Sequence, residues 1–314
     1  MATANATANG VISKRTGSVS LRQHEERVAF LFLLPWLIGF LAFTAFPIVA
    51  SLFLSLTEYP ILHSPEFVGL RNYAQMVAGD PLFWQSLKVT TIYTVAIVPL
   101  QLVTAYALAI LLNQTVHGLS VFRTVFFLPA VTPAVATALM WMWVFHPEIG
   151  LANSALAGIG IEGPKWLAST EWALPTFIII SLWGIGGGMV IYLAGLQSVP
   201  TSLYEAAELD GAGAWSRFIH VTLPMTSPVI LFVTVTSMIG SFQVFTAAFV
   251  MTDGGPVNAT LFFVLHLYNH GWRFLQMGYA SALAWVLFVI ILALTLLLLR
   301  LSGRLVYYEA EERS

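Results

Sequence analysis

The sequence has no cysteine and very few charged residues. Asp, Glu, Lys and Arg make up 9% of the 314 residues, whereas an ordinary soluble domain has roughly 25%. Without cysteine, disulfides, thiolate nucleophiles and cysteine metal sites are excluded. The net charge of -2 and the scattered basic residues offer no basic face for nucleic acid, so no nucleic-acid partner is expected.

The chain also lacks a phosphate-binding loop. No Gly-Lys pair occurs in the sequence, and the GxxxxGK[ST] loop that cradles nucleotide phosphates requires one. If ATP drives this protein, a separate subunit must therefore hydrolyse it.

Long apolar runs separate the few charged segments of the sequence. A bilayer core about 30 Å thick needs about 20 mainly apolar residues in a helix. Six stretches qualify: about 28–56, 86–112, 121–145, 172–197, 228–251 and 279–300. They are too long for barrel strands, which have about ten residues. We therefore predict an all-α membrane protein with six transmembrane helices, kinked near some of the prolines in these runs.

The basic residues predict the orientation, because cytoplasmic segments carry an excess of Lys and Arg. With the N-terminus inside, nine of the 13 basic residues are cytoplasmic and four are outside. The inside segments hold Lys14, Arg15, Arg22, Arg27, Arg123, Arg217, Arg300, Arg304 and Arg313, and the outside segments hold Arg71, Lys88, Lys165 and Arg273. Both termini and the loop 200–228 are then cytoplasmic.

This topology divides the chain into three parts. Residues 1–27 are predicted to be a cytoplasmic tail, disordered over about residues 1–20, which are rich in Ala, Thr, Asn and Ser. Residues 28–301 form the six-span domain, and residues 302–314 form a second cytoplasmic tail.

The interiors of the six runs contain no Asp, Glu, Lys or Arg. An ion-coupled transporter usually holds an ionisable residue at membrane depth, so this absence argues against that class. Serine and backbone carbonyls can bind sodium without a carboxylate, so an ion-coupled secondary transporter stays open as an alternative. A membrane scaffold, which needs no polar cavity, is another.

Residues 202–228 place acidic and polar side chains between two apolar runs. Ser202 and Glu205 have the spacing of a capping box, which predicts a short helix from about 203 to 210. Gly211 and Gly213 would end it, and a second short segment would follow from about 215 to 221. A cytoplasmic turn with merely solvated acidic residues is the simpler interpretation of the same pattern.

Six residues of this loop resemble the EAA signature of ABC importer permeases. They are Glu205, Ala206, Ala207, Gly211, Leu223 and Pro224, in the pattern EAA, three residues, Gly, nine residues, Ile, one residue, Leu-Pro. The one departure is Val221 in place of Ile. The resemblance implies that this loop, including Asp210, forms a coupling helix that docks into a cleft of a cytoplasmic ATPase subunit.

The resemblance extends from about residue 28 to 301 and is to the carbohydrate class, of the maltose or glycerol-phosphate first-permease type. It implies the binding-protein-dependent ABC importer permease fold in a prokaryotic inner membrane. The implied partners are a second related permease, two ATPase subunits that hold ATP and Mg²⁺, and an extracytoplasmic solute-binding protein. The chain itself would bind no cofactor and catalyse no bond chemistry.

The fifth run carries candidate solute ligands. Ser237 and Ser241 are four residues apart and therefore share a helix face, with Gln243 nearby. Their hydroxyls could bind a sugar or could simply bond their own or a neighbouring helix. The resemblance favours solute contact for both serines.

The fourth run carries Trp183, Gly184 and Gly187. The resemblance aligns the two glycines with solute-contacting positions, and Trp183 could pack against a sugar ring. Gly184 and Gly188 also fit GxxxG, which permits close helix packing, and a glycine-rich segment at membrane depth is a common sign of a binding site. Both interpretations stay open.

Two further expectations concern the ligand. No Lys or Arg lies at membrane depth to meet a phosphate, which favours a neutral sugar over glycerol phosphate. His146, His266 and His270 show no convincing metal spacing, so they are predicted to be surface residues and no metal site is expected.

Overall fold

The computed structural model describes residues 18–114 and 116–303. The chain divides into two compact units, residues 1–53 and residues 54–314. Most of the predicted N-terminal tail, up to residue 17, and nearly all of the predicted C-terminal tail, from residue 304, lie outside the described residues.

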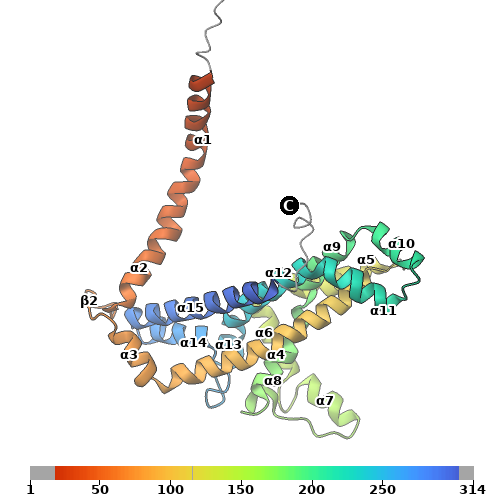
Figure 1. Cartoon of the computed structure of the whole chain (residues 1–314). Coiled ribbons are helices and arrows are strands. Elements are labelled where there is room, and N and C mark those ends of the chain that lie inside the picture. Colours follow the sequence, from red (N-terminus) through yellow and green to blue (C-terminus); the bar gives the residue numbers. More distant parts are fainter. Residues whose placement is uncertain (1–17, 115, 304–314) are drawn as a thin grey trace, which may run out of the picture. The chain divides into compact units, whose positions relative to one another are not determined.

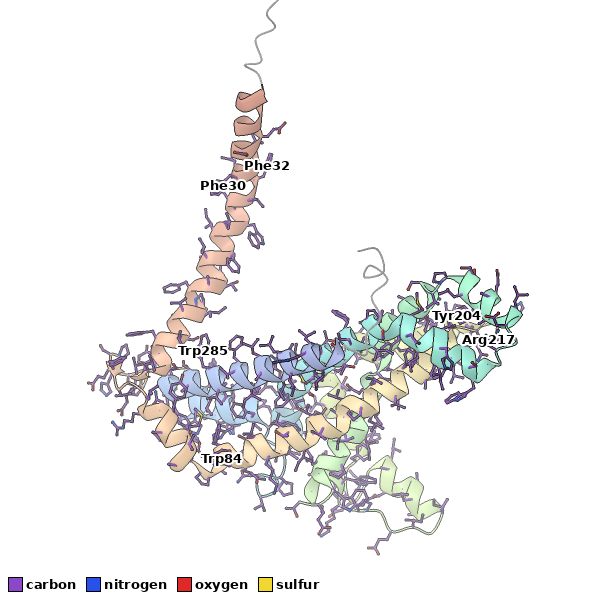
Figure 2. All side chains as sticks on the ribbon, in the orientation of Figure 1. Phe30, Phe32, Trp84, Tyr204, Arg217 and Trp285 are labelled. Atoms are coloured by element: carbon purple, nitrogen blue, oxygen red, sulfur yellow. The ribbon has the colours of Figure 1, made fainter. Side chains whose placement is uncertain are left out.

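The first unit is one long helix. It consists of α1 (Ser18–Phe40), the π-helical turn η1 (Leu41–Ala45) and α2 (Phe46–Ser55), whose last two residues belong to the second unit. The π turn ends two residues before Pro47, which lacks the N–H that a regular helix needs. Phe30 and Phe32 project from α1 (Figure 2) and are 59% and 79% exposed. Because apolar residues lie on all sides of the helix, Val28–Ser55 suits a lipid environment.

The second unit starts with a small hairpin and a short helix. Strands β1 (Thr57–Glu58) and β2 (Glu66–Phe67) pair antiparallel, and α3 (Arg71–Ala78) follows. The Asn72 side chain donates hydrogen bonds to the carbonyls of Ser55 and Thr57, at 2.8 and 2.9 Å. These bonds fix α3 against the chain that enters the unit.

The rest of the second unit is helical. Its elements are α4 (Pro81–Leu112), α5 (Leu119–Phe127), η2 (Leu128–Val131), α6 (Ala134–Val144), α7 (Leu151–Gly158), η3 (Trp166–Ala168), α8 (Ala173–Ser181), η4 (Leu182–Gly184), α9 (Gly186–Gln197), α10 (Thr201–Leu209), α11 (Ala214–Arg217), η5 (Phe218–Thr222), α12 (Leu223–Phe242), α13 (Thr246–Met251), α14 (Phe263–Tyr268), η6 (Asn269–Arg273) and α15 (Met277–Ser302).

The predicted six apolar runs recur in the structure. Four helical stretches are long and apolar enough to cross a membrane: Val28–Ser55, Pro81–Leu112, Ala214–Met251 and Met277–Ser302. Two bent pairs, Leu119–Val131 with Ala134–Val144 and Ala173–Gly184 with Gly186–Gln197, complete a set of six if each pair is one span. The all-α membrane fold is therefore confirmed.

The two bends have different causes. The third run turns by 99° at Thr132 and Pro133, because the residue before a proline is driven into extended backbone and a proline can begin but not continue a helix. The fourth run turns by 45° at residues 184–186, where glycine permits a wider range of backbone conformations than other residues. Pro175 stands in the first turn of α8, where a missing N–H costs little.

Helix α4 is the centre of the second unit. Figure 1 shows it running between α3 and α5, with the hairpin and α3 at one end of the unit and α10 and α11 at the other. It packs against α8, α9, α12 and α14. Asp80 caps its N-terminus, since Oδ1 accepts from the backbone N–H groups of Leu82 and Phe83. Arg123 closes the other end by donating from Nη2 to the Leu112 carbonyl, at 2.7 Å.

The half of the bundle nearer α10 and α11 is tightly packed at aromatic and glycine residues. Tyr106 of α4 meets Tyr192 of α9 edge to face, with ring centroids 5.2 Å apart, and its hydroxyl lies 2.7 Å from Thr226 Oγ1 of α12. A Cβ on Gly195 of α9 would lie 2.9 Å from a methyl of Val229. The absence of a side chain at position 195 therefore lets α9 and α12 approach closely.

Candidate functional site

A cavity of about 410 Å³ lies between α4, α6, α8, η4, α12 and α13. Seven of its lining residues carry hydroxyl or amide groups: Tyr93, Gln101, Thr132, Thr137, Ser181, Ser237 and Ser241. The others are apolar or glycine, and no Asp, Glu, Lys or Arg is among the lining residues that the structure describes. The cavity therefore suits an uncharged ligand with several hydroxyl groups.

Of the two predicted serines, only Ser237 has a free hydroxyl. Both line the cavity from α12. Ser241 is 6% exposed, and its Oγ lies 2.8 Å from the Met238 carbonyl and 3.0 Å from Thr94 Oγ1. Ser237 is half-buried, and no hydrogen-bond partner for it occurs within residues 18–114 and 116–303. The hydroxyl of Ser241 is thus engaged in hydrogen bonds within and between helices. The hydroxyl of Ser237 is available to a ligand.

Trp183 and Gly184 also line the cavity, at the break in the fourth run. The Trp183 ring is 45% exposed and meets Trp141 edge-on, with centroids 5.7 Å apart. An added Cβ on Gly184 would have no heavy atom within 4 Å. An aromatic face and an uncrowded backbone therefore flank the same opening.

Gln243 and Gly187 do not line this cavity. Gln243 is exposed at the C-cap of α12, and Gly187 is half-buried in the first turn of α9. Their role as solute contacts stays a prediction.

The glycines between residues 184 and 188 have different surroundings. A Cβ on Gly188 would make only ordinary contacts with Val233 and Ala105, at 3.5 and 3.7 Å. The tight approach is at Gly186, where a Cβ would fall 2.1 Å from the Phe126 carbonyl oxygen. Close helix packing therefore rests on Gly186, while Gly184 faces the cavity.

Sequence reasoning missed the wall of the cavity that α4 and α8 build. The Tyr93 hydroxyl lies 2.6 Å from Ser181 Oγ, and Gln101 Nε2 donates to the Ser181 carbonyl at 3.3 Å. These residues are 80 or more positions apart in sequence. The available signal was the presence of an amide and hydroxyls inside otherwise apolar runs.

The predicted loop helix forms, but its cap differs from the prediction. Helix α10 spans Thr201–Leu209 with Pro200 as its N-cap, and no side chain caps it. Ser202 lies inside the helix, so the predicted capping box between Ser202 and Glu205 is wrong. The reason is that Pro200 has extended backbone and α10 starts directly after it, one residue before Ser202. Gly211 follows with φ +77, where glycine is strongly favoured.

The second predicted segment is the beginning of a longer helix. Helix α11, the π turn η5 and α12 run without interruption from residue 214 to residue 242. Leu223 and Pro224 are the first residues of α12, where proline is well tolerated. The second part of the loop, from residue 214, and the cavity-lining serines are therefore parts of one continuous helix.

Two side-chain contacts hold α10 against this helix. The Tyr204 hydroxyl lies 3.0 Å from Thr222 Oγ1, and Arg217 Nη1 donates to Glu208 Oε1. Figure 2 shows Tyr204 and Arg217 together at the end of the second unit where α10 and α11 lie. Glu208 is 62% exposed, so the ion pair adds little stability by itself, but together the contacts orient α10.

The outer surface of the loop is exposed and partly apolar. Glu205, Ala206 and Asp210 are exposed, and Ala207 is half-buried. Leu209 and Trp215, which sequence reasoning did not single out, are 90% and 72% exposed. Large apolar side chains beside acidic ones are typical of a surface that a protein partner covers.

The histidine prediction is wrong in one respect. His146 is exposed as expected, but His266 is 2% exposed, and it lies with His270 beside Asp80. The apolar stretch that surrounds it in α14 packs inward against α4 and α15, which carries His266 into the interior.

Comparisons with known proteins agree on the family. The model of the binding-protein-dependent transport system inner membrane component family matches residues 101–307. YesP of Bacillus subtilis (strain 168), a probable ABC transporter permease protein, is 41% identical over 310 residues, which cover 98% of this chain and 99% of YesP. LacF of Rhizobium radiobacter, a lactose transport system permease protein, is 36% identical over 305 residues, or 95% and 99% of the two chains.

A solved structure has the same fold. A chain of the crystal structure of a bacterial alginate ABC transporter, in complex with an alginate pentasaccharide-bound periplasmic protein, superposes with a TM-score of 0.80. The match covers 90% of this chain and 96% of that chain at 22% sequence identity. These relatives are permease subunits and not enzymes themselves. The chain belongs to the family of binding-protein-dependent transport system inner membrane components, as an ABC transporter permease.

Proposed function

We propose that this chain is a transmembrane permease subunit of an ATP-driven importer for a neutral sugar, and that residues 201–222 dock onto its ATPase subunit. One observation carries the proposal: the exposed loop and the polar cavity are joined by a single helix that is continuous from residue 214 to residue 242. From Ala214 to Ser237 this helix is roughly 35 Å long at about 1.5 Å per residue. A displacement of α11, where this helix begins, would therefore be transmitted along the helix to the cavity.

The cavity supports the choice of solute. Its hydroxyl and amide groups can exchange hydrogen bonds with sugar hydroxyls, and the exposed face of Trp183 can pack on the apolar face of a sugar ring. A phosphate would need a cation or several backbone N–H donors, and the described lining offers no Lys or Arg. Among the relatives, LacF is named for lactose transport. These points favour a neutral sugar over a glycerol phosphate.

The partners follow from the family and from the missing phosphate loop. A second, related permease would complete the translocation pathway, two ATPase subunits would hold ATP and Mg²⁺, and an extracytoplasmic binding protein would deliver the sugar. Closure of the ATPase dimer would move α10 and, through it, α12, which biases the permease between outward-facing and inward-facing states. In this orientation both termini are cytoplasmic, in agreement with the distribution of basic residues.

The ion-coupled alternative needs a coupling group beside the solute. Within the described part of the chain, the cavity has no carboxylate and no basic side chain that could bind an ion or a proton. An exposed loop connected to the cavity by a continuous helix is also not needed by such a transporter. The geometry therefore supports the ATP-driven importer better.

Two single-cysteine variants test the docking of the loop, because the natural chain has no cysteine. Leu209 in the loop is 90% exposed and Leu62 in the hairpin is 80% exposed, so Leu209→Cys and Leu62→Cys form a matched pair. A membrane-impermeant maleimide should label Leu62→Cys in intact cells and Leu209→Cys only in inverted vesicles. The ATPase subunit should protect Leu209→Cys and leave the labelling of Leu62→Cys unchanged.

Two outcomes would contradict the docking proposal. Labelling of Leu209→Cys from outside intact cells would place the loop on the wrong side of the membrane. Equal labelling of Leu209→Cys with and without the bound ATPase subunit would show that the loop is not the docking surface.

A further inference from the structure

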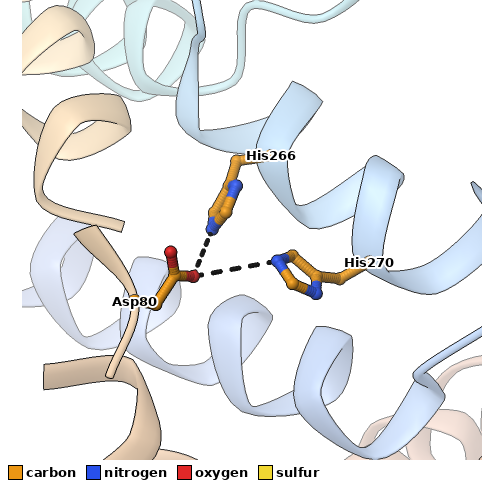
Figure 3. Close-up of side chains that lie close together, drawn as sticks. All are labelled: Asp80, His266 and His270. Atoms are coloured by element: carbon orange, nitrogen blue, oxygen red, sulfur yellow. Dashed lines mark hydrogen bonds and ion pairs between the residues drawn. The ribbon is translucent and has the colours of Figure 1, made fainter. Parts of the chain in front are cut away.

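Three potential metal ligands from separate elements converge where α4 begins. Figure 3 shows Asp80 with His266 of α14 and His270 of η6 turned toward it. His266 Nε2 lies 2.9 Å from Asp80 Oδ2, and His270 Nε2 lies 3.7 Å from the same oxygen. We propose that Asp80, His266 and His270 form a binding site for one divalent transition-metal ion, with Zn²⁺ the best suited.

The ligand types and spacing fit this ion. Zn²⁺ takes imidazole nitrogen and carboxylate oxygen at about 2.0–2.2 Å in tetrahedral geometry, which places ligand atoms roughly 3.3 Å apart. The three ligand atoms here all lie within 4.8 Å of one another. The two distances to Asp80 Oδ2, 2.9 and 3.7 Å, differ from that spacing by about 0.4 Å each. The fourth position would be left for water.

Neighbouring groups orient the ligands. Gln276 Oε1 lies 2.9 Å from His270 Nδ1 and, as an acceptor, places the proton on that nitrogen. His270 Nε2 faces Asp80 Oδ2 and is the nitrogen through which His270 would bind the ion. A hydrogen bond at the other ring nitrogen, which fixes the orientation of the ring, is typical of metal-binding histidines.

The carboxylate of Asp80 is held in the same manner. The Tyr279 hydroxyl donates to Oδ2 at 2.7 Å, and the backbone N–H groups of Leu82 and Phe83 donate to Oδ1. Outer hydrogen bonds of this kind fix a metal ligand before the ion arrives and are typical of protein metal sites.

The site is partly enclosed and lies beside a second cavity. His266 is 2% exposed, while Asp80 and His270 are 13% and 15% exposed. Gln276 and Tyr279, which orient the ligands, line an adjoining cavity of about 300 Å³. None of the three ligands lines the larger cavity that contains Ser237. A bound ion would tie α4, α14 and η6 together at the end of the unit opposite the loop.

Direct titration of Zn²⁺ tests the site. The full chain, purified through a tag without histidines and stripped with a chelator, is placed in lipid nanodiscs and titrated by calorimetry. One Zn²⁺ per chain is expected. Asp80→Asn and His270→Ala should each weaken binding at least tenfold, and Gln276→Ala should weaken it about tenfold through the lost orientation of His270. Asn also caps helices well, so Asp80→Asn keeps the start of α4 intact.

Two exposed histidines supply the controls. His63→Ala and His117→Ala remove histidines outside the cluster, and both variants should bind Zn²⁺ like the natural chain. Zn²⁺ should also raise the unfolding temperature of the natural chain but not that of Asp80→Asn or His270→Ala. Undetectable binding to the natural chain, or equal affinity in the cluster variants and the controls, would overturn the proposal.

Discussion

Replacing Gly211 with valine should abolish sugar uptake by the assembled transporter while leaving the chain in the membrane. Gly211 has φ +77 at the turn between α10 and α11. A β-branched residue is a genuine outlier there, and the strain is of order 1–3 kcal/mol. The turn would open, and α10 would lose the orientation that Tyr204 and Arg217 give it. ATP hydrolysis by the complex should continue but no longer respond to sugar-loaded binding protein.

The neighbouring glycine is the matched control. Gly213 has φ -69 and ψ 169, which any residue can adopt, and an added Cβ there would have no heavy atom within 4 Å. Gly213→Val should therefore retain most of the uptake. Normal uptake by Gly211→Val, or an equal loss in both variants, would contradict a specific role of the Gly211 turn in coupling.

Replacing Ser237 with phenylalanine should reduce sugar uptake by at least a hundredfold. Ser237 lines the cavity, is half-buried and has a hydroxyl free for a ligand. A phenyl ring would extend into the space that the sugar must occupy, and it offers no hydrogen bond. Uptake by proteoliposomes, together with sugar-independent ATP hydrolysis as a measure of assembly, checks this expectation.

Substitutions at the two serines separate size from hydrogen bonding. Ser237→Ala removes one hydrogen bond, worth about 0.5–1.5 kcal/mol, and should raise KM by roughly three- to tenfold with little change in kcat. Ser241→Ala should affect stability more than KM, because the Ser241 hydroxyl already bonds within the bundle. Unchanged uptake by Ser237→Phe would show that the sugar does not pass through this cavity.

The fold and the loop could be predicted because their signals are local. An uncharged run of 20 or more residues has few stable alternatives to a membrane helix, and the apolar runs recur in the structure with modest differences at their ends. The spacing from Glu205 to Pro224 identified the family that the comparisons confirm. Gly211 was expected to end a helix, and its positive φ is the physical reason.

Features that depend on tertiary contacts could not be predicted. Asp80 and His266 are 186 residues apart, so only the folded chain brings them together. His266 and His270 are four residues apart and share a helix face, but this spacing says nothing of a third ligand in a distant part of the sequence. Likewise, whether Ser241 or Ser237 is free depends on Thr94, a residue of α4 that pairs with Ser241 across 147 positions.

Reconstituted uptake tests the central claim most directly. Proteoliposomes that contain this chain, its second permease and the ATPase subunits should accumulate sugar only when binding protein is outside and ATP and Mg²⁺ are inside. Omission of any of these components should abolish accumulation. Uptake of sugar by the purified chain alone, driven by an ion gradient without ATP, would contradict the proposed function.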